Sequence, residues 1–207
     1  MIKKSILGIL GIALLQSCIV VKSTKYSSSD PQQNQANTGT TITFKGNPIK
    51  TVGQLPNVGT SAPKFQLTNK TMEEVSLNDF IGKYIVLNIF PSIDTKVCSA
   101  SVRHFNQDAA DLPNTVVLCI SKDLPFAQER FCGAEGIKNV MMLSDFRNNF
   151  GKMYGVEMST GAMKGLLSRA IVVINPEGKI TYQEQVSDIS HQPNYEAALS
   201  FIPKSRK

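Results

Sequence analysis

Short apolar segments alternate with amphipathic and polar ones from about Thr41 to the C-terminal end of the chain. The runs YIVLNIF (84–90) and TVVLCIS (115–121) are almost wholly apolar, as expected for strands covered on both faces. The pattern further predicts a β-hairpin beginning at TITFKGN, a strand pair or a strand and turn at KFQLTN and EEVSLND, and a strand at NVMMLSD. Two more strands are predicted around the NPEG turn of RAIVVINPEGKITYQEQV.

Helices are predicted between and after these strands. One contains Cys98 in its first turn, because apolar side chains follow Cys98 at steps of four, three, four and three residues, namely Val102, Phe105, Ala109 and Leu112. A second helix is expected at 125–132, an irregular or helical stretch through Tyr154, and a last helix at YEAALSFI.

The order of these elements predicts an α/β protein with a thioredoxin-like fold and an N-terminal β-hairpin extension. In open sheets of this kind, functional groups gather beyond the C-terminal ends of the strands. Cys98 falls at such a place, directly after the strand at 84–90.

The N-terminal residues follow a different pattern. Lys3 and Lys4 precede an apolar run at 6–15 that is too short to span a bilayer and is typical of the core of an export signal. The run ends in Leu-Gln-Ser-Cys18, which resembles the lipobox of bacterial lipoproteins, where cleavage precedes the cysteine and lipid is attached to its sulfur. An ordinary secretory signal cut near the same place is the alternative.

We therefore expect three parts in the chain: a lipoprotein signal peptide at 1–17, a lipidated Cys18 with a disordered polar tether at 18–41, and a folded domain at 42–207. This organisation places the domain in the cell envelope, as a periplasmic or surface lipoprotein anchored to a membrane through Cys18.

Charge and motifs exclude several functions. The net charge of +6 falls to +4 without Lys3 and Lys4, and no dense basic block or interleaved aromatic residues support nucleic-acid binding. The sequence has no Gly-rich phosphate loop, no His-Glu metal motif and no Gly-x-Ser-x-Gly elbow. The scattered methionines are interpreted as core residues rather than a copper site, and His104 and His191 have no ligand spacing.

The cysteines differ in their surroundings. If Cys18 carries lipid, three remain, so in an oxidising compartment at least one thiol is unpaired or pairs only transiently. Cys119 lies within an apolar strand, and packing explains it. Cys132 precedes Gly133 in a helix or turn that can open, which would allow it to react. Alternatively, Cys132 is a packing residue or forms a permanent disulfide with Cys98.

Cys98 is the candidate for chemistry. Unpaired N–H groups and the helix dipole favour a thiolate in a first helical turn, but the dipole contributes at most about 1 kcal/mol at an exposed site. A guanidinium about 4 Å away contributes about 4 kcal/mol at an effective dielectric near 20. We therefore expect an arginine beside Cys98, and spacing alone does not choose among Arg103, Arg130, Arg147 and Arg169.

Two further residues precede Cys98. Pro91 fixes its own φ and lacks an N–H, so it stiffens the loop after the strand and can screen the sulfur from water. Thr95 stands three residues before Cys98, where its hydroxyl can cap the helix and face the sulfur.

The spacing Pro91-x-x-x-Thr95-x-x-Cys98 after a strand resembles that of the peroxiredoxins. The segments NIFPSIDTKVCSASVRHFN, VVLCISKDLPFAQERFCGAEG and SRAIVVI are similar to those of bacterial thiol peroxidases, an atypical two-cysteine subfamily. The resemblance runs from about Thr43 to Ile202.

This resemblance implies a role for each residue. Cys98 would be the peroxidatic cysteine, which attacks a hydroperoxide as a thiolate and becomes a sulfenic acid, and Cys132 the resolving cysteine, which forms an intramolecular disulfide with it. Thr95 would hydrogen-bond the thiolate and the peroxide, Arg169 would supply the cation, and Pro91 would shield the sulfur.

The resemblance also implies a homodimer that acts on hydrogen peroxide and alkyl hydroperoxides, is reduced by thioredoxin, and needs no metal or organic cofactor. The lipobox departs from typical members, so we expect an envelope thioredoxin-like protein as the electron donor. We also expect one or both cysteine segments to unwind, since a disulfide needs a Cα separation of roughly 4.4 to 6.8 Å.

Two other functions compete with this prediction. An anchored thiol–disulfide oxidoreductase would carry a Cys-x-x-Cys pair, but residue 101 is serine. A disulfide-stapled binding lipoprotein without enzymatic activity would have no use for Pro91, Thr95 and Arg169.

Overall fold

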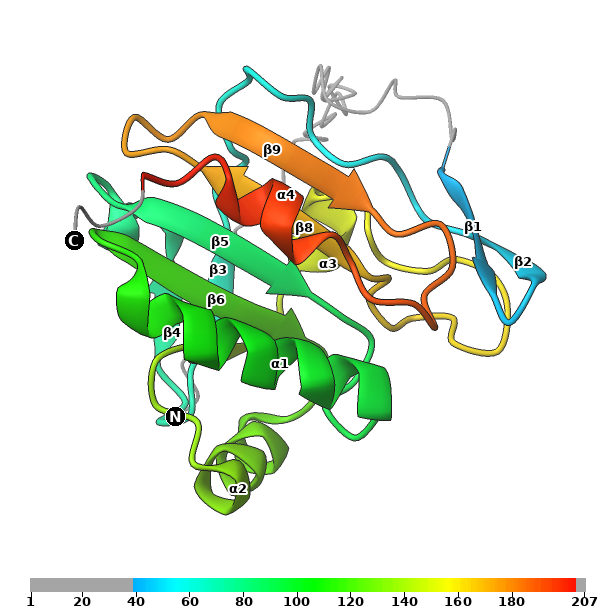
Figure 1. The fold of residues 1–207 in the computed structure, drawn as a ribbon. Helices are drawn as coiled ribbons and strands as arrows, with labels where there is room; N and C mark the ends of the chain where they lie inside the picture. The colour runs from blue at the N-terminus through cyan, green and yellow to red at the C-terminus, as the bar shows by residue number, and fades with distance from the viewer. Residues whose placement is uncertain (1–38, 204–207) are drawn as a thin grey trace, which may run out of the picture. The chain divides into compact units, whose positions relative to one another are not determined.

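The computed structural model describes residues 39–203, which form a seven-stranded sheet with helices on both faces and a separate two-stranded hairpin (Figure 1). The strands are β1 (Thr41–Phe44), β2 (Asn47–Lys50), β3 (Gln66–Thr68), β4 (Glu74–Ser76), β5 (Tyr84–Ile89), β6 (Thr115–Ser121), β7 (Met141–Ser144), β8 (Ala170–Ile174) and β9 (Ile180–Gln185). The helices are α1 (Lys96–Asp108), α2 (Pro125–Glu135), α3 (Phe150–Met153) and α4 (Tyr195–Leu199), with 3-10 turns η1 (Leu77–Phe80) and η2 (Ala109–Asp111). The predicted signal peptide, Cys18 and most of the predicted tether lie outside the described residues.

The sheet confirms the predicted α/β architecture and the predicted N-terminal hairpin. Its strand order is β4-β3-β7-β6-β5-β8-β9, in which β5, β6 and β7 are parallel and β8 runs antiparallel to β5. The short pair β3–β4 and the hairpin β1–β2 are antiparallel. Hydrophobic cores cover both faces of the sheet at β5, which explains the nearly continuous apolar sequence of this strand.

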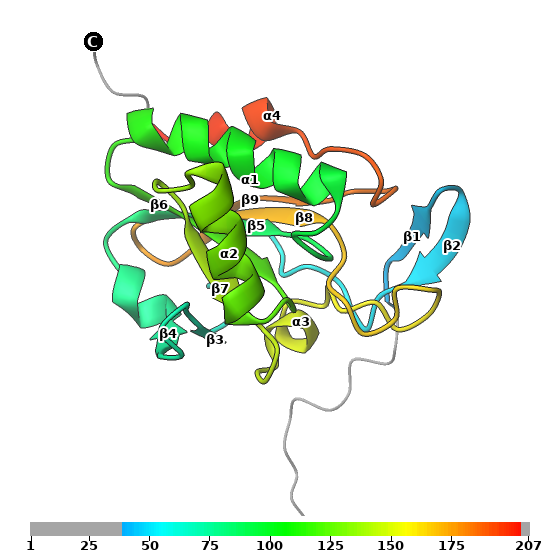
Figure 2. The same cartoon turned by 90° about the horizontal axis from the view of Figure 1, so that it is seen from below.

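The alternation of side chains along β5 separates two hydrophobic cores. Ile85, Leu87 and Ile89 face a core that includes α3 and η1. Val86 and Phe90 face the other core, which includes the buried side of α1 together with residues of α2 and α4. Figure 2 shows α1 and α4 on one side of the sheet and α3 on the other.

Two helix ends differ from the predicted ones. The amphipathic pattern predicts a helix through Leu112, but α1 ends at Asp108 and passes through a 3-10 turn to an extended Leu112, because Pro113 follows and disfavours a helical residue before it. α2 continues past Cys132 to Glu135, and the left-handed conformation that ends it is adopted by Gly136, at φ 66°, rather than by Gly133.

Candidate active site

The sheet topology brings three segments that are distant in sequence to one edge. Ile89, the last residue of β5, pairs with Ala170, the first residue of the antiparallel β8, so Arg169 lies beside the residues that follow β5. β6 is parallel to β5, and Asp123 follows its end. The loop before α1, the residue before β8 and the loop after β6 therefore meet at the C-terminal edge of the parallel strands.

Cys98 is fully buried in the first turn of α1, as predicted. Thr95 is the N-cap: its hydroxyl oxygen accepts a hydrogen bond of 3.4 Å from the backbone N–H of Cys98. The same hydroxyl donates to the carbonyl of Ser92 at 3.2 Å. The capping role of Thr95 is confirmed, whereas its hydroxyl proton is directed to the loop and not to the sulfur.

Arg169 is the arginine that reaches the thiol. Its Nη2 donates to the sulfur of Cys98 at 3.2 Å, and its Nε donates to the carbonyl of Ile189 at 3.0 Å. The side chain is 2 % exposed, and among the described residues its Nη1 has no hydrogen-bond partner. Arg169 thus has one buried nitrogen, Nη1, whose hydrogens meet no acceptor among the described residues, on the guanidinium that bonds the sulfur of Cys98.

The other candidate arginines lie elsewhere. Arg103 forms a bidentate ion pair with Glu135. Arg147 pairs with Glu74, and Arg130 is exposed. The structure therefore agrees with the choice of Arg169 that the family resemblance implies.

A tight turn fixes the carbonyl that holds Arg169. Asp188 accepts hydrogen bonds from the backbone and side chain of Ser190 and from the side chain of Thr43, so it connects this turn to β1. The hydrogen bonds from Ser190, followed by that from Thr43, hold the pKa of the Asp188 carboxyl well below its usual range. Ile189 lies inside the turn, and its carbonyl accepts from Arg169 Nε.

Pro91 is buried at the end of β5, as its expected shielding role requires. The loop that follows it is held by Asp123, a residue that sequence reasoning missed. The carboxylate of Asp123 accepts from the hydroxyl of Ser92 and from the backbone N–H of Ile93, both at 2.7 Å. Its position just after an apolar parallel strand is the signal that could have placed Asp123 at this edge.

Cys132 lies half-buried within α2 and packs at the border of the core that contains Cys98. Burial raises the pKa of its thiol, an effect that Lys70 opposes. It lines a pocket of about 640 Å³ together with residues of the β3–β4 turn, of the end of α2 and of β7. Cys98, Cys119 and Cys132 are all free thiols in this structure.

Cys119 has the structural role predicted for it. It is fully buried in β6, and burial raises the pKa of its thiol to about 12. The side-chain amide of Asn88 donates to its sulfur at 3.5 Å and accepts from Ser101 on α1 at 2.9 Å. A thiol in this environment stays protonated and serves as a packing residue.

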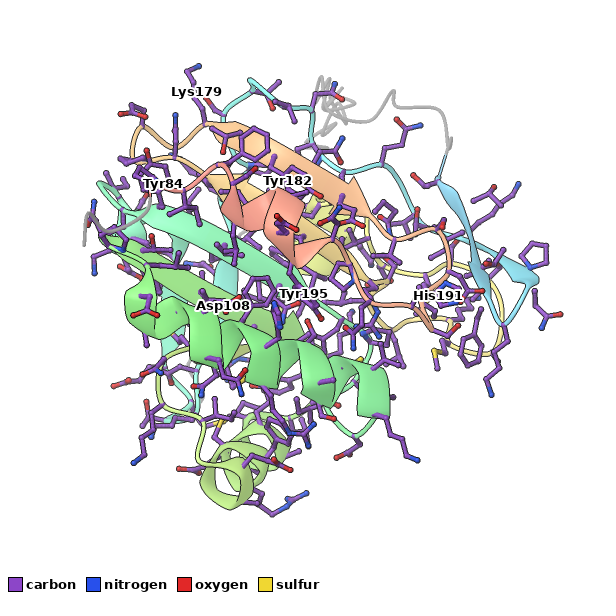
Figure 3. All side chains as sticks on the ribbon, in the orientation of Figure 1. Tyr84, Asp108, Lys179, Tyr182, His191 and Tyr195 are labelled. Carbon is purple, nitrogen blue, oxygen red and sulfur yellow. The ribbon has the colours of Figure 1, made fainter. Side chains whose placement is uncertain are left out.

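Tyr195 of α4 and Gln192 just before α4 contact α1, which carries Cys98 in its first turn. Figure 3 shows Tyr195 between α4 and α1, where its ring stacks on His104 with centroids 4.0 Å apart. The hydroxyl of Tyr195 donates to the side chain of Gln192, whose amide donates to the carbonyl of Val97 at 3.2 Å. The turn that carries Cys98 is therefore bonded on two sides.

Residues 39–203 offer neither a metal centre nor a membrane-spanning helix. No group of three or more His, Cys, Asp or Glu side chains in this part of the chain is arranged to hold a metal ion. None of the helices of these residues is long and apolar enough to cross a bilayer.

Comparison with known proteins gives consistent matches. Residues 57–199 match the family model described as Redoxin. The chain is 56 % identical to a thiol peroxidase of Mycobacterium tuberculosis over 161 residues, which are 78 % of this chain and 97 % of that protein. It is 52 % identical to a thiol peroxidase of Corynebacterium glutamicum over 159 residues, covering 77 % of this chain and 96 % of the relative.

A solved structure agrees with these sequence matches. The peroxiredoxin-like protein from Aquifex aeolicus superimposes with a TM-score of 0.73 at 38 % identity, covering 78 % of this chain and 94 % of that protein. The matched regions include the loop after β5, α1, α2 and the start of β8, all of which carry the site described above.

Proposed function

The chain belongs to the Redoxin family and is a thiol peroxidase, and we propose that Cys98 is its nucleophile toward hydrogen peroxide and alkyl hydroperoxides. The observation that carries this assignment is the 3.2 Å contact between the buried Cys98 sulfur and Arg169 Nη2 at a helix N-terminus. The thiolate of Cys98 attacks one oxygen of the hydroperoxide and the O–O bond breaks. Cys98 becomes a sulfenic acid, and the other oxygen leaves as water or an alcohol after it takes up a proton.

Arg169 has two tasks in this reaction. Nη2 faces the negative charge of the sulfur before the attack. Nη1 is buried and has no partner among the described residues, which supports a role as donor to a peroxide oxygen as negative charge builds up there. A donor that is already oriented stabilises the transition state without a cost of reorganisation, and one such donor typically contributes about a hundredfold or more to the rate.

Thr95 and Pro91 complete the pocket. The Thr95 hydroxyl accepts from Cys98 N–H, and rotation of its hydrogen away from the Ser92 carbonyl lets it donate to the thiolate or to the peroxide. The buried ring of Pro91 keeps water from the sulfur and adds no competing N–H group. The first N–H groups of α1 add unpaired donors on the same side.

Cys132 is the resolving residue in this proposal. Its thiol condenses with the sulfenic acid of Cys98, which forms the disulfide and releases water. Cys98 is fully buried in the first turn of α1 and Cys132 lies within α2, and we expect at least one of these helices to open before the sulfurs bond. α2 is the helix that is held less firmly, because only Pro125 and Gln128 among its residues are buried.

A dithiol protein of the thioredoxin type returns the electrons in our proposal, by thiolate attack on the disulfide and release of Cys98 and Cys132 as thiols. We also propose a homodimer. Leu124 and Phe126 support it, since these side chains at the start of α2 are 51 % and 55 % exposed. If these two side chains form the dimer contact, a Leu124→Ser/Phe126→Ser variant should be a monomer. Sedimentation analysis of this variant and of the wild type tests the proposal.

The location in the cell is a further part of the proposal. The Leu-Gln-Ser-Cys18 segment after a short apolar run supports a lipoprotein held at a membrane of the cell envelope, with an envelope thioredoxin-like protein as its reductant. Labelling of cells with a radioactive fatty acid tests this location. Label in the wild type and none in Cys18→Ala supports it, and a soluble wild type without label contradicts it.

The Cys98 assignment is tested by peroxide consumption in rapid-mixing experiments with the reduced protein. With one equivalent of hydrogen peroxide, the wild type should form the disulfide, Cys132→Ser should stop at the sulfenic acid of Cys98, and Cys98→Ser should be inactive. Activity that survives in Cys98→Ser contradicts the assignment. Equal and negligible rates in the wild type and Cys98→Ser would favour a binding protein over an enzyme.

A further inference from the structure

Asp123 connects the segment that carries Cys98 to the segment that carries Cys132. Its carboxylate accepts three hydrogen bonds: from Ser92 Oγ to Oδ1, and from Ile93 N–H and Ser121 Oγ to Oδ2, each at 2.7 Å. Hydrogen bonds to an ionised acceptor are about twice as strong as those between neutral groups. The carboxylate therefore acts as a firm common anchor for these two segments.

On the Cys98 side, the anchor fixes the turn that begins α1. Ser92 is held by Asp123, and its carbonyl accepts from both the backbone N–H and the hydroxyl of Thr95 at 3.2 Å. Thr95 in turn caps α1 through the N–H of Cys98. Unwinding of the first turn of α1 therefore works against the hydrogen bonds between Asp123 and the loop.

On the Cys132 side, the link passes through Ser121 to Gln128. The hydroxyl of Ser121 donates to Asp123 and accepts from the side-chain amide of Gln128 at 3.0 Å. Gln128 is 1 % exposed and lies one helical turn before Cys132, and its amide also donates to the carbonyl of Leu143. It is the buried polar side chain that holds α2 to the sheet.

We propose that Asp123 is a positioning residue that sets how the sulfenic acid of Cys98 divides between two reactions. In the first, the thiol of Cys132 condenses with it to give the disulfide and water. In the second, another hydroperoxide oxidises it to a sulfinic acid and leaves as water or an alcohol. The inference rests on the proposed function of both cysteines.

The direction of the effect follows from the geometry. Disulfide formation requires a helix to open, and opening breaks the chain of hydrogen bonds from Gln128 to Ser92, whereas oxidation by a second hydroperoxide occurs in the closed site. A weaker anchor therefore speeds disulfide formation relative to sulfinic acid formation. One net hydrogen bond corresponds to about a fivefold change in such an equilibrium.

The test uses the reduced full chain, treated with increasing hydrogen peroxide and analysed by alkylation and mass spectrometry. Asp123→Ala should raise the peroxide concentration that converts half of Cys98 to sulfinic acid by about fivefold or more. Asp123→Asn should lie between the wild type and Asp123→Ala, because its amide keeps one acceptor oxygen but loses the negative charge and the second acceptor. Gln128→Met should raise the same peroxide concentration, because it removes the hydrogen bonds that hold α2 to the sheet. The rate at which Cys98 attacks the first hydroperoxide should stay within about twofold of the wild-type rate, because the loop before α1 is not affected.

Asp79→Ala is the matched control. Asp79 lies in η1 and accepts from the backbone N–H and the hydroxyl of Ser76, so its removal deletes similar hydrogen bonds in another part of the fold. The sulfinic acid fraction should not change in this variant even if the melting temperature falls.

The possible outcomes separate this inference from the function on which it rests. Folded Asp123→Ala and Gln128→Met variants with the sulfinic acid fraction of the wild type would overturn the inference and leave the peroxidase function intact. If Asp123→Ala and Asp79→Ala change the peroxide concentration for half conversion to sulfinic acid by the same amount, the inference is also overturned. Asp123 would then contribute only to general stability. A wild type that forms neither disulfide nor sulfinic acid at Cys98 would overturn the proposed function itself.

Discussion

Arg169 Nη2 lies 3.2 Å from the sulfur of Cys98, although the two residues are 71 positions apart in the sequence. The antiparallel pairing of β5 with β8 produces this contact, because it places the residue before β8 at the end of β5. The hydrogen bond from Arg169 Nε to the Ile189 carbonyl then orients the guanidinium plane. The cation is therefore held by the sheet and by one loop, and not by the helix that carries the thiol.

Substitution of Arg169 by lysine should lower the rate of attack on hydrogen peroxide by about a hundredfold. Lysine keeps the charge but has a single donor atom, so it cannot bond Ile189, the sulfur and a peroxide oxygen in one plane. The measurement is single-turnover peroxide consumption by the reduced protein. Arg147→Lys, on the exposed pair with Glu74, is the control and should retain the wild-type rate. A rate for Arg169→Lys within threefold of the wild type would contradict the assigned role.

Replacement of Thr95 by valine should reduce both stability and activity. Loss of the N-cap costs about 1 kcal/mol, which lowers the melting temperature by about 2–4 °C for a domain of this size. The rate of peroxide attack should fall about tenfold or more, because valine has no hydroxyl donor. Thr95→Ser keeps the hydroxyl and should retain most of the stability and rate. If Thr95→Val loses stability alone, the hydroxyl serves only as a cap.

Much of the fold was predictable because the strands are short apolar runs with turn residues between them. β6 has the same limits as the predicted strand TVVLCIS, and the spacing of apolar side chains after Cys98 correctly placed the thiol on the buried face of α1. The prediction for α2 was less accurate at its end. The sequence predicts a helix at 125–132, whereas α2 continues to Glu135 because Gly136 adopts the terminating conformation.

The partners of Cys98 were harder to predict from residue patterns. Four arginines satisfied the electrostatic requirement, and the choice of Arg169 depended on family resemblance because strand register does not follow from spacing alone. Asp123 and Gln128 were not predicted at all. Their roles depend on the direction of side chains at the end of β6 and at the start of α2, which the hydrophobic pattern does not determine.

The thiol of Cys132 should react with iodoacetamide more slowly at neutral pH in the folded protein than in the unfolded chain. Burial raises its pKa, so a smaller fraction is thiolate at a given pH, and the rise in reaction rate should occur at a higher pH than for an ordinary cysteine. The measurement is the rate of alkylation of Cys132 itself against pH in Cys98→Ser, followed by mass spectrometry of the peptide that contains Cys132. The same variant in denaturant is the control. Coincident pH profiles in the two conditions would contradict the effect of burial.

Asp188 should contribute to stability at neutral pH and lose this contribution in acid. Its pKa is lowered in the folded protein, chiefly by the hydrogen bonds from Ser190, so the carboxylate stabilises the fold above its ordinary value of 3.8 and progressively less as the pH falls below it. Melting temperatures should therefore differ between the wild type and Asp188→Ala at pH 7, and the difference should narrow below about pH 4. Because the turn also holds the carbonyl bonded to Arg169, the variant should attack peroxide more slowly at pH 7. A difference in melting temperature that stays constant from pH 7 to pH 3 would show that the charge of Asp188 is not what holds the turn.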